Sequence, residues 1–305
     1  MSNFWRQKRQ IIRATAFRAD GPFVPDRRTV HFAFRVAGPF ILHFTLAINS
    51  FAQSPYELRT GRELAIFGVG AATGVSVLVL ETQVKPLTPG EISALNRADV
   101  NAFDRRATYR LSTTADRFSD VTLAGGIAGL GLLAVGTKPM RQDLKTVGVM
   151  YLETMLLANG VQRSVKNITQ RTRPFVYNPA APLDGKQERK ARQSFFSGHA
   201  TNAFATAVFT GEVFRHYFPD SKLKPVIWVG SLGLATATAV LRYEGGLHYP
   251  TDLLAGAAFG SLVGWGIPKL HEVKNRSELG RRLNVQPWSD GQVNGIYVRL
   301  AVFSR

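Results

Sequence analysis

Apolar segments of helix length, separated by polar stretches, run through the central part of this chain. Six of them lie at residues 64–80, 121–136, 146–165, 199–218, 226–241 and 251–267. Apolar residues recur in them at helical spacing, and the last segment is followed by Pro268, which interrupts a helical hydrogen-bond ladder. The pattern predicts an all-α fold, a helical bundle with about six core helices.

The polar segments around these helices carry shorter signals. Pro89 stands near the expected start of a surface helix over residues 91–103. Ser119 and Asp120 are candidate N-cap residues of the second long helix. Near the end of the chain, Asn294-Gly295 is a turn dipeptide followed by alternating residues, which predicts a short C-terminal β-hairpin.

The N-terminal part has the features of an export signal. An apolar run over residues 36–48 follows Arg35 and precedes the small-x-small pattern Ser50-x-Ala52, which predicts a signal peptide cleaved after Ala52. A buried helix is the alternative. The expected organisation is an upstream extension plus signal peptide over residues 1–52, a helical domain over 53–270, and a polar tail with the hairpin over 271–305.

Composition and charge narrow the chemistry and the partners. The chain has 305 residues, a net charge of +17 and no cysteine, so disulfides, thiolate metal sites and cysteine nucleophiles are excluded. A basic surface favours anionic partners. The sequence has no nucleic-acid-binding motif, and its basic runs are not interleaved with aromatic residues. A solvated basic surface is therefore favoured over nucleic-acid binding.

Three short stretches, in order along the chain, contain the side chains of a phosphate-transfer site. They are Lys166-x6-Arg173-Pro174, Ser197-Gly198-His199 and Arg242-x5-His248-x3-Asp252. Cationic side chains can hold the oxygens of a phosphoryl group, two histidines can attack phosphorus and protonate a leaving group, and a carboxylate can orient a histidine. Any one stretch is a weak signal, but all three in order indicate phosphate chemistry.

The three stretches together resemble the tripartite signature of the type 2 phosphatidic acid phosphatase (PAP2) superfamily, which also includes vanadium haloperoxidases and class A bacterial acid phosphatases. Phe196 stands where the family usually has proline, and Leu241 where it usually has serine. The resemblance implies a metal-independent phosphatase with no cofactor. It would hydrolyse phosphate monoesters or lipid and isoprenoid (di)phosphates through a phosphohistidine intermediate.

The resemblance, combined with residue chemistry, assigns the catalytic roles. His248 is the expected nucleophile, because imidazole has a large unprotonated fraction at neutral pH. Asp252, four residues on, is expected to accept a hydrogen bond from one ring nitrogen of His248 and to orient the other toward the substrate. His199 resembles the family's general acid, which protonates the leaving oxygen.

The remaining motif residues are expected to bind the phosphate. Lys166, Arg173 and Arg242 resemble the family's phosphate clamp and would stabilise the charge of the transition state. Ser197 and Gly198 are expected at a helix N-terminus, where backbone N–H groups and the helix dipole favour an anion.

Charged residues outside the three stretches are assigned no part in the site. Arg171 is interpreted as a surface charge. Four acidic residues alternate with arginines and are interpreted as surface ion pairs rather than a metal site: Asp99, Asp104, Asp116 and Asp120. Four histidines show no ligand spacing and are given no role: His31, His43, His216 and His271.

Two other functions fit the same motifs. A vanadium haloperoxidase would use the same cations and histidines to hold vanadate, a phosphate analogue, with His248 as its ligand. A non-catalytic envelope protein would keep the bundle and bind an anionic headgroup without turnover.

Signals for membrane insertion point both ways. Basic loops over residues 138–145 and 215–224 suit a spanning bundle. A mean hydropathy of −0.04 and the charges of Glu153 and Glu212 inside helical segments argue against it. The sequence therefore favours an exported bundle, soluble or loosely membrane-attached, in a bacterial-type cell envelope. It would lie in the periplasm, or in the inner membrane with its active site facing the periplasm.

Overall fold

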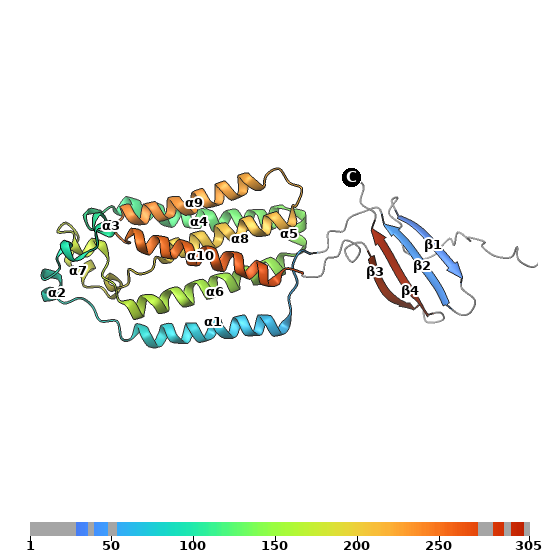
Figure 1. Ribbon diagram of the computed structural model, residues 1–305, viewed down its shortest axis with the longest axis horizontal. Helices are drawn as coiled ribbons and strands as arrows, with labels where there is room; N and C mark the ends of the chain where they lie inside the picture. Colours follow the sequence, from blue (N-terminus) through green and yellow to red (C-terminus); the bar gives the residue numbers. More distant parts are fainter. Residues whose placement is uncertain (1–28, 36–39, 48–53, 274–282, 290–293, 302–305) are drawn as a thin grey trace, which may run out of the picture. The chain divides into compact units, whose positions relative to one another are not determined.

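The computed structural model describes residues 29–35, 40–47, 54–273, 283–289 and 294–301. The chain forms two compact units (Figure 1). One comprises Ser54–Glu272 and is helical. The other combines Met1–Gln53 with Val273–Arg305, and its described residues form a small β-sheet.

Six long helices build the helical unit, as the hydrophobic pattern predicts. They are α1 (Thr60–Glu81), α4 (Thr113–Gly136), α6 (Leu144–Thr169), α8 (Gly198–Tyr217), α9 (Lys224–Glu244) and α10 (Pro250–His271). Helix α8 lies in the middle of the bundle and packs against four others: α4, α6, α9 and α10 (Figure 1). Helix α10 continues through Pro268 to His271, so the expectation that it ends at the proline is wrong.

Shorter elements connect the long helices. At one end of the bundle lie α2 (Pro89–Ser93), η1 (Arg97–Asp99), α3 (Ala102–Arg105), η2 (Arg106–Tyr109), η3 (Pro174–Tyr177), α7 (Leu183–Lys186) and η4 (Arg189–Arg192). Helix α5 (Lys138–Gln142) lies at the other end (Figure 1). Helix α2 begins at Pro89 as predicted, but no single helix covers residues 91–103. The helix is broken because the side chains of Asn96 and Asn101 accept backbone N–H groups and cap new turns.

Glycines bring α8 and α10 into backbone contact. Gly256, Gly260 and Gly264 recur every four residues along α10, and a Cβ atom at any of them would collide with the backbone of residues 197–205 in and before α8. Residues four apart share one face of a helix. This close packing places the start of α8 beside the start of α10.

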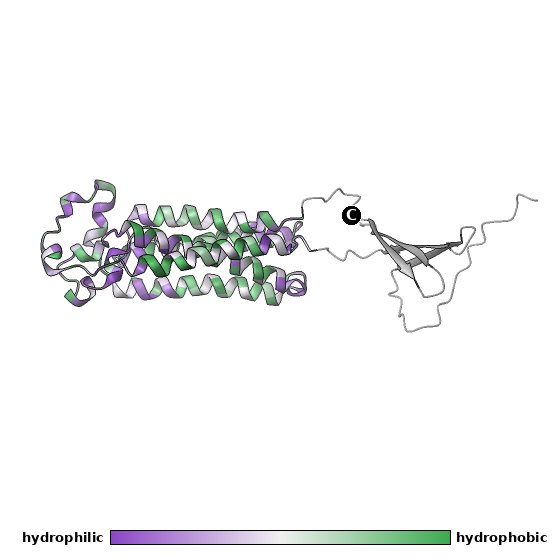
Figure 2. Ribbon diagram, turned by 90° about the horizontal axis from the view of Figure 1, so that it is seen from below, coloured by the Kyte–Doolittle hydropathy of each residue, from purple (hydrophilic) through white to green (hydrophobic). Residues whose placement is uncertain are grey.

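The helical unit has the surface of a membrane-embedded bundle. Helices α1, α4, α9 and α10 are long and apolar enough to cross a membrane, and hydrophobic residues cover much of the long helices (Figure 2). Large apolar side chains on them are exposed, among them Leu132 at 75% and Val229 at 73%. Glu153 and Glu212 are buried within the bundle and do not face lipid. The preference for a soluble or loosely attached bundle is therefore corrected.

The second unit contains a four-stranded sheet in the order β1-β2-β4-β3. Its strands are β1 (Thr29–Arg35), β2 (Phe40–Ala47), β3 (Leu283–Ser289) and β4 (Asn294–Ala301). Strands β3 and β4 pair antiparallel and form the expected C-terminal hairpin, but Asn294 pairs with Ser289 and begins β4 instead of forming the turn. The apolar run that predicts a signal peptide lies partly in β2. The cleavage point after Ala52 lies outside the described residues and stays a prediction.

Candidate active site

The predicted site residues meet at the end of the bundle that carries α2, α3 and α7 (Figure 1). A cavity of about 390 Å³ opens there between the ends of α6, α8 and α9 and the loop before α10. Six of the eight predicted residues line it: Lys166, Arg173, Gly198, His199, Arg242 and His248. Ser197 and Asp252 are fully buried behind the wall of the cavity.

Four residues of cationic type line this cavity: Arg163, Lys166, Arg173 and Arg242. Arg173 and Arg242 are 8% and 7% exposed, and among the described residues neither Nε atom has a hydrogen-bond partner. Burial, followed by the nearby charge of Arg242, lowers the pKa of Arg173 to about 10. Cations held this close together repel one another, so an anion in the cavity would relieve that repulsion.

Helix α4 supplies acidic partners to two of the predicted site residues. Arg242 Nη1 donates to Asp116 Oδ1 and, at 3.2 Å, to Ser119 Oγ. Asp120 Oδ1 lies 2.7 Å from His199 Nε2. Asp116 and Asp120 are therefore not merely surface ion pairs, which corrects their interpretation. The prediction that Ser119 or Asp120 caps this helix is wrong, because α4 begins at Thr113.

The start of α8 presents His199 to the cavity. Ser197 is the N-cap of α8, as expected, and its Oγ accepts the N–H of Ala200 at 3.3 Å. That hydroxyl is used within the helix terminus and does not line the cavity. Gly198 packs against Gln162, whose Nε2 donates to the Phe196 carbonyl at 2.9 Å.

His248 and Asp252 lie side by side, but they are not hydrogen bonded. His248 Nδ1 is 3.6 Å from Asp252 Oδ2, and among the described residues this nitrogen has no hydrogen-bond partner. Asp252 Oδ2 instead accepts from Ser194 Oγ at 2.5 Å and from the Tyr249 N–H at 3.0 Å. The structure thus places the predicted pair together without forming the expected bond.

The environment of His248 favours its neutral form. Its side chain is 1% exposed. Burial and the nearby charges of Arg173, Lys166 and Arg242 hold the pKa of His248 well below its ordinary value. A neutral ring keeps a lone pair available at physiological pH.

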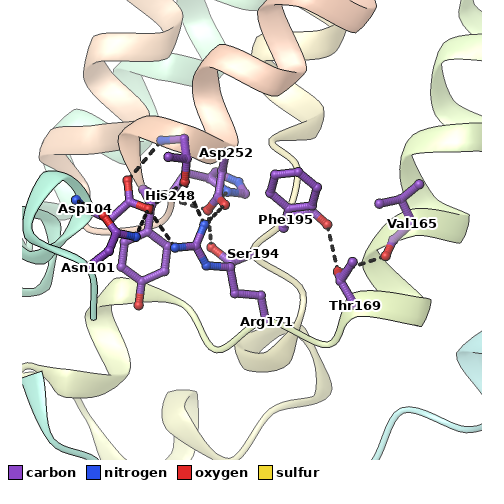
Figure 3. Close-up of polar contacts among 11 residues, drawn as sticks. Asn101, Asp104, Val165, Thr169, Arg171, Ser194, Phe195, His248 and Asp252 are labelled. Carbon is purple, nitrogen blue, oxygen red and sulfur yellow. Dashed lines mark hydrogen bonds and ion pairs between the residues drawn. The ribbon is translucent and has the colours of Figure 1, made fainter. Parts of the chain in front are cut away.

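Arg171 is part of the site, although the sequence indicated only a surface charge. Its Nη1 donates to Asp252 Oδ1 at 2.5 Å and its Nη2 to Asp104 Oδ2 at 2.8 Å (Figure 3). Its guanidinium carbon lies 4.0 Å from the centre of the Tyr249 ring. Arg171 therefore bridges two buried carboxylates directly behind His248.

Asp104 completes this support from α3. The side chain is fully buried and accepts from the Thr251 N–H at 3.0 Å and from Asn101 Nδ2 at 2.9 Å (Figure 3). Its interpretation as a surface ion pair is wrong. The only sequence signal for this network was the position of Arg171 two residues before the motif residue Arg173.

Comparison with known protein families gives a match to part of this chain. The model of the PAP2 superfamily matches residues 148–276. The match spans less than half of the 305-residue chain. The matched segment contains all eight predicted site residues, whereas Asp104, Asp116 and Asp120 lie before it.

Two individual proteins are similar to this chain. The lipid A 4'-phosphatase of Porphyromonas gingivalis is 27% identical over 154 residues, which cover 49% of this chain and 61% of that protein. A transmembrane PAP2-type phosphatidylglycerolphosphate phosphatase from Bacillus subtilis is 20% identical, with a TM-score of 0.39. That match covers 68% of this chain and 98% of the Bacillus chain.

Proposed function

We propose that this protein is a PAP2-type phosphatase that hydrolyses lipid phosphates or related phosphate esters through a phosphohistidine intermediate, without a metal in its active site. One observation carries the proposal: a buried His248, kept neutral, shares a cavity with Lys166, Arg173 and Arg242. A neutral nucleophile within a cationic cavity suits attack on an anionic phosphoryl group.

The proposed reaction has two steps. The three cations bind the phosphoryl oxygens, and His248 attacks phosphorus through Nε2, since Nδ1 faces Asp252. The bond from phosphorus to the leaving oxygen breaks, and protonated His199 transfers its proton to that oxygen. Neutral His199 then accepts a proton from water as the water attacks phosphorus. The phosphorus–nitrogen bond breaks, and phosphate and neutral His248 are released.

The cations perform the electrostatic work of this reaction. Charge on the equatorial oxygens of a phosphoryl transition state must be neutralised by fixed positive groups. Two arginines and a lysine can supply that charge from three directions, and arginine forks match pairs of phosphate oxygens. The Asp116–Arg242 pair orients one of these forks without filling the cavity.

A lipid substrate is supported by the surroundings of the site. The cavity opens at one end of a bundle whose long helices are apolar outside (Figure 2), so a membrane would hold the site near its headgroup layer. The Porphyromonas relative is named for action on lipid A. We infer a phosphate attached to a lipid or isoprenoid anchor.

The activity test uses the purified full-length chain in detergent. Phosphate release is measured in EDTA from phosphatidic acid, an isoprenyl diphosphate and an aryl phosphate, beside His248→Ala. We expect release from at least one lipid substrate, loss of activity in the variant, and an acid-labile phosphoryl group trapped on the wild-type chain. No release, combined with vanadate-dependent halide oxidation, would transfer the assignment to a haloperoxidase.

We also propose that the site faces the periplasm. This orientation places the start of α1 in the cytoplasm and is therefore incompatible with a signal peptide cleaved after Ala52. The turns at the opposite end carry Lys138, Arg141 and Lys145, and short basic loops tend to stay in the cytoplasm. The cysteine-free chain allows a direct test with Ser93→Cys at the site end and Gln142→Cys at the other end. A membrane-impermeant maleimide is applied to cells whose outer membrane has been permeabilised. It should label only the Ser93→Cys variant. Labelling only the Gln142→Cys variant would reverse the orientation.

A further inference from the structure

A second cluster of ionisable side chains lies at the far end of α10. His271 is the last residue of that helix, Glu63 lies in the first turn of α1, and Glu153 lies within α6. His271 Nε2 is 2.9 Å from Glu63 Oε1 and 3.1 Å from Glu153 Oε2. Helix α10 has 22 residues, which at 1.5 Å per residue separates this cluster from the active site by about 33 Å.

The tautomer of His271 is set by its second ring nitrogen. Nδ1 lies 2.8 Å from the carbonyl oxygen of Ile267, and a carbonyl can only accept a hydrogen bond, so Nδ1 carries the proton. In the neutral ring, Nε2 then presents a lone pair toward the two carboxylates. An Nδ1–H held by a backbone carbonyl is the arrangement usually found behind a metal-ligating histidine.

The cluster is buried and lacks donors. His271 and Glu153 are fully buried, and the Glu63 side chain is 13% exposed. Among the described residues, His271 Nε2 and both carboxylate oxygens of Glu153 have no hydrogen-bond partner. Arg62 donates to Glu63 at 2.8 Å and balances one of the two carboxylates. A carboxylate at Glu153 would be left without a fixed cation, which is costly for a buried group.

The distances within the cluster are compatible with three ligands of one ion. Two ligands about 2.1 Å from a metal, at roughly 90–109° to each other, lie about 3.0–3.4 Å apart. The two nitrogen–oxygen distances are 2.9 and 3.1 Å, and all three ligand atoms lie within 4.8 Å of one another. Among the described residues no hydrogen bond to His271 Nε2 is found, as expected when its lone pair faces the two carboxylates.

We propose that Glu63, Glu153 and His271 bind one divalent transition-metal ion of the Zn²⁺ type. One imidazole nitrogen and two carboxylate oxygens suit such an ion, whereas Ca²⁺ and Mg²⁺ prefer oxygen ligands alone. Because the ligands come from three helices, the ion joins α1, α6 and α10 at the end opposite the active site. Its role is structural, and it is separate from the phosphate chemistry.

The test measures the metal and not the activity. Full-length protein is purified in detergent without chelator, and bound Zn²⁺ is counted by mass spectrometry for the wild type, Glu153→Gln and His216→Gln. His216 is a matched control because it lies 3.1 Å from Glu272 but outside the cluster. We expect about one Zn²⁺ per chain in the wild type and the control, and a clearly lower Zn²⁺ content in Glu153→Gln, because that variant lacks one of the three ligands.

A second measurement does not depend on the variant folding. Co²⁺ added to chelator-treated wild-type protein should give visible absorption bands that Zn²⁺ removes, because both ions compete for one site. The absence of bound Zn²⁺ and of Co²⁺ bands from the wild type would overturn the proposal, as would equal Zn²⁺ content in Glu153→Gln. Phosphatase activity that persists after the ion is removed by a chelator would agree with a structural role for the ion.

Discussion

The guanidinium group of Arg171 donates to Asp252 Oδ1 at 2.5 Å. The other carboxylate oxygen, Oδ2, faces His248 Nδ1 at 3.6 Å and is already bonded to Ser194 and to the backbone of Tyr249. Hydrogen bonds from Arg171, Ser194 and Tyr249 therefore position Asp252 before it acts on His248. A shift of less than 1 Å would bring Oδ2 within hydrogen-bond distance of the ring, because such bonds reach about 3.2 Å. We infer that substrate binding closes this gap as His248 gains positive character.

Replacing Arg171 should impair catalysis more than binding. Arg171→Gln removes the support of Asp252, and misplacement of a catalytic group by about 1 Å can cost on the order of 100-fold in rate. We expect kcat to fall by about that factor with a much smaller change in KM. Steady-state kinetics beside Arg192→Gln, whose partner Glu91 is half exposed, would check this. Equal losses in both variants would show that Arg171 is only a surface charge.

Replacing Asp120 should slow hydrolysis most for substrates whose leaving oxygen must be protonated. The Asp120 carboxylate lies beside His199 Nε2 and favours the protonated imidazole. Asp120→Asn removes that carboxylate. Alkyl phosphates need their leaving oxygen protonated and should lose about 10- to 100-fold in kcat, whereas aryl phosphates with good leaving groups should lose far less. Comparing the two substrate classes, with Asp99→Asn as the control, isolates this effect. A uniform loss across substrates would rule out a role through His199.

The sequence was sufficient to predict those parts of the fold and site that depend on short, local patterns of residues. Six apolar segments at helical spacing became the six long helices, and the three motif stretches meet at one end of the bundle. These signals are local, since helical periodicity acts over a few residues and each motif is short.

The parts that escaped prediction depend on contacts between distant segments. Asp116 is 126 residues from Arg242, Asp120 is 79 from His199, and Asp104 is 67 from Arg171. An aspartate that alternates with arginines looks the same in the sequence whether it faces water or a buried partner. Only the packing of α3 and α4 against the site distinguishes the two cases.

The pH profile should report the cationic surroundings of His248. Its pKa is lowered by burial and by the charges of Arg173, Lys166 and Arg242. The neutral nucleophile thus persists below the ordinary histidine pKa of about 6.5. In the wild type, the acid limb of kcat/KM should fall below that pH. Lys166→Gln should shift the limb upward because a repelling charge is lost, whereas Lys166→Arg should not. An identical limb in all three proteins would contradict this origin of the low pKa.

The contact between α8 and α10 should tolerate no side chain at Gly260. A Cβ there meets the backbone of Thr201, which cannot move aside as a flexible side chain can. Gly260→Ala should destabilise the bundle by about 1–3 kcal/mol, as overpacking does, and should lower activity because the starts of both helices carry site residues. Gly266→Ala is the matched control on the same helix, since nothing lies within 4 Å of its Cβ. It should be neutral or stabilising by about 0.5–1 kcal/mol through helix propensity. Thermal unfolding of both variants in detergent, followed by phosphatase assays, would measure the difference, and equal melting temperatures would show that the two helices do not depend on this contact.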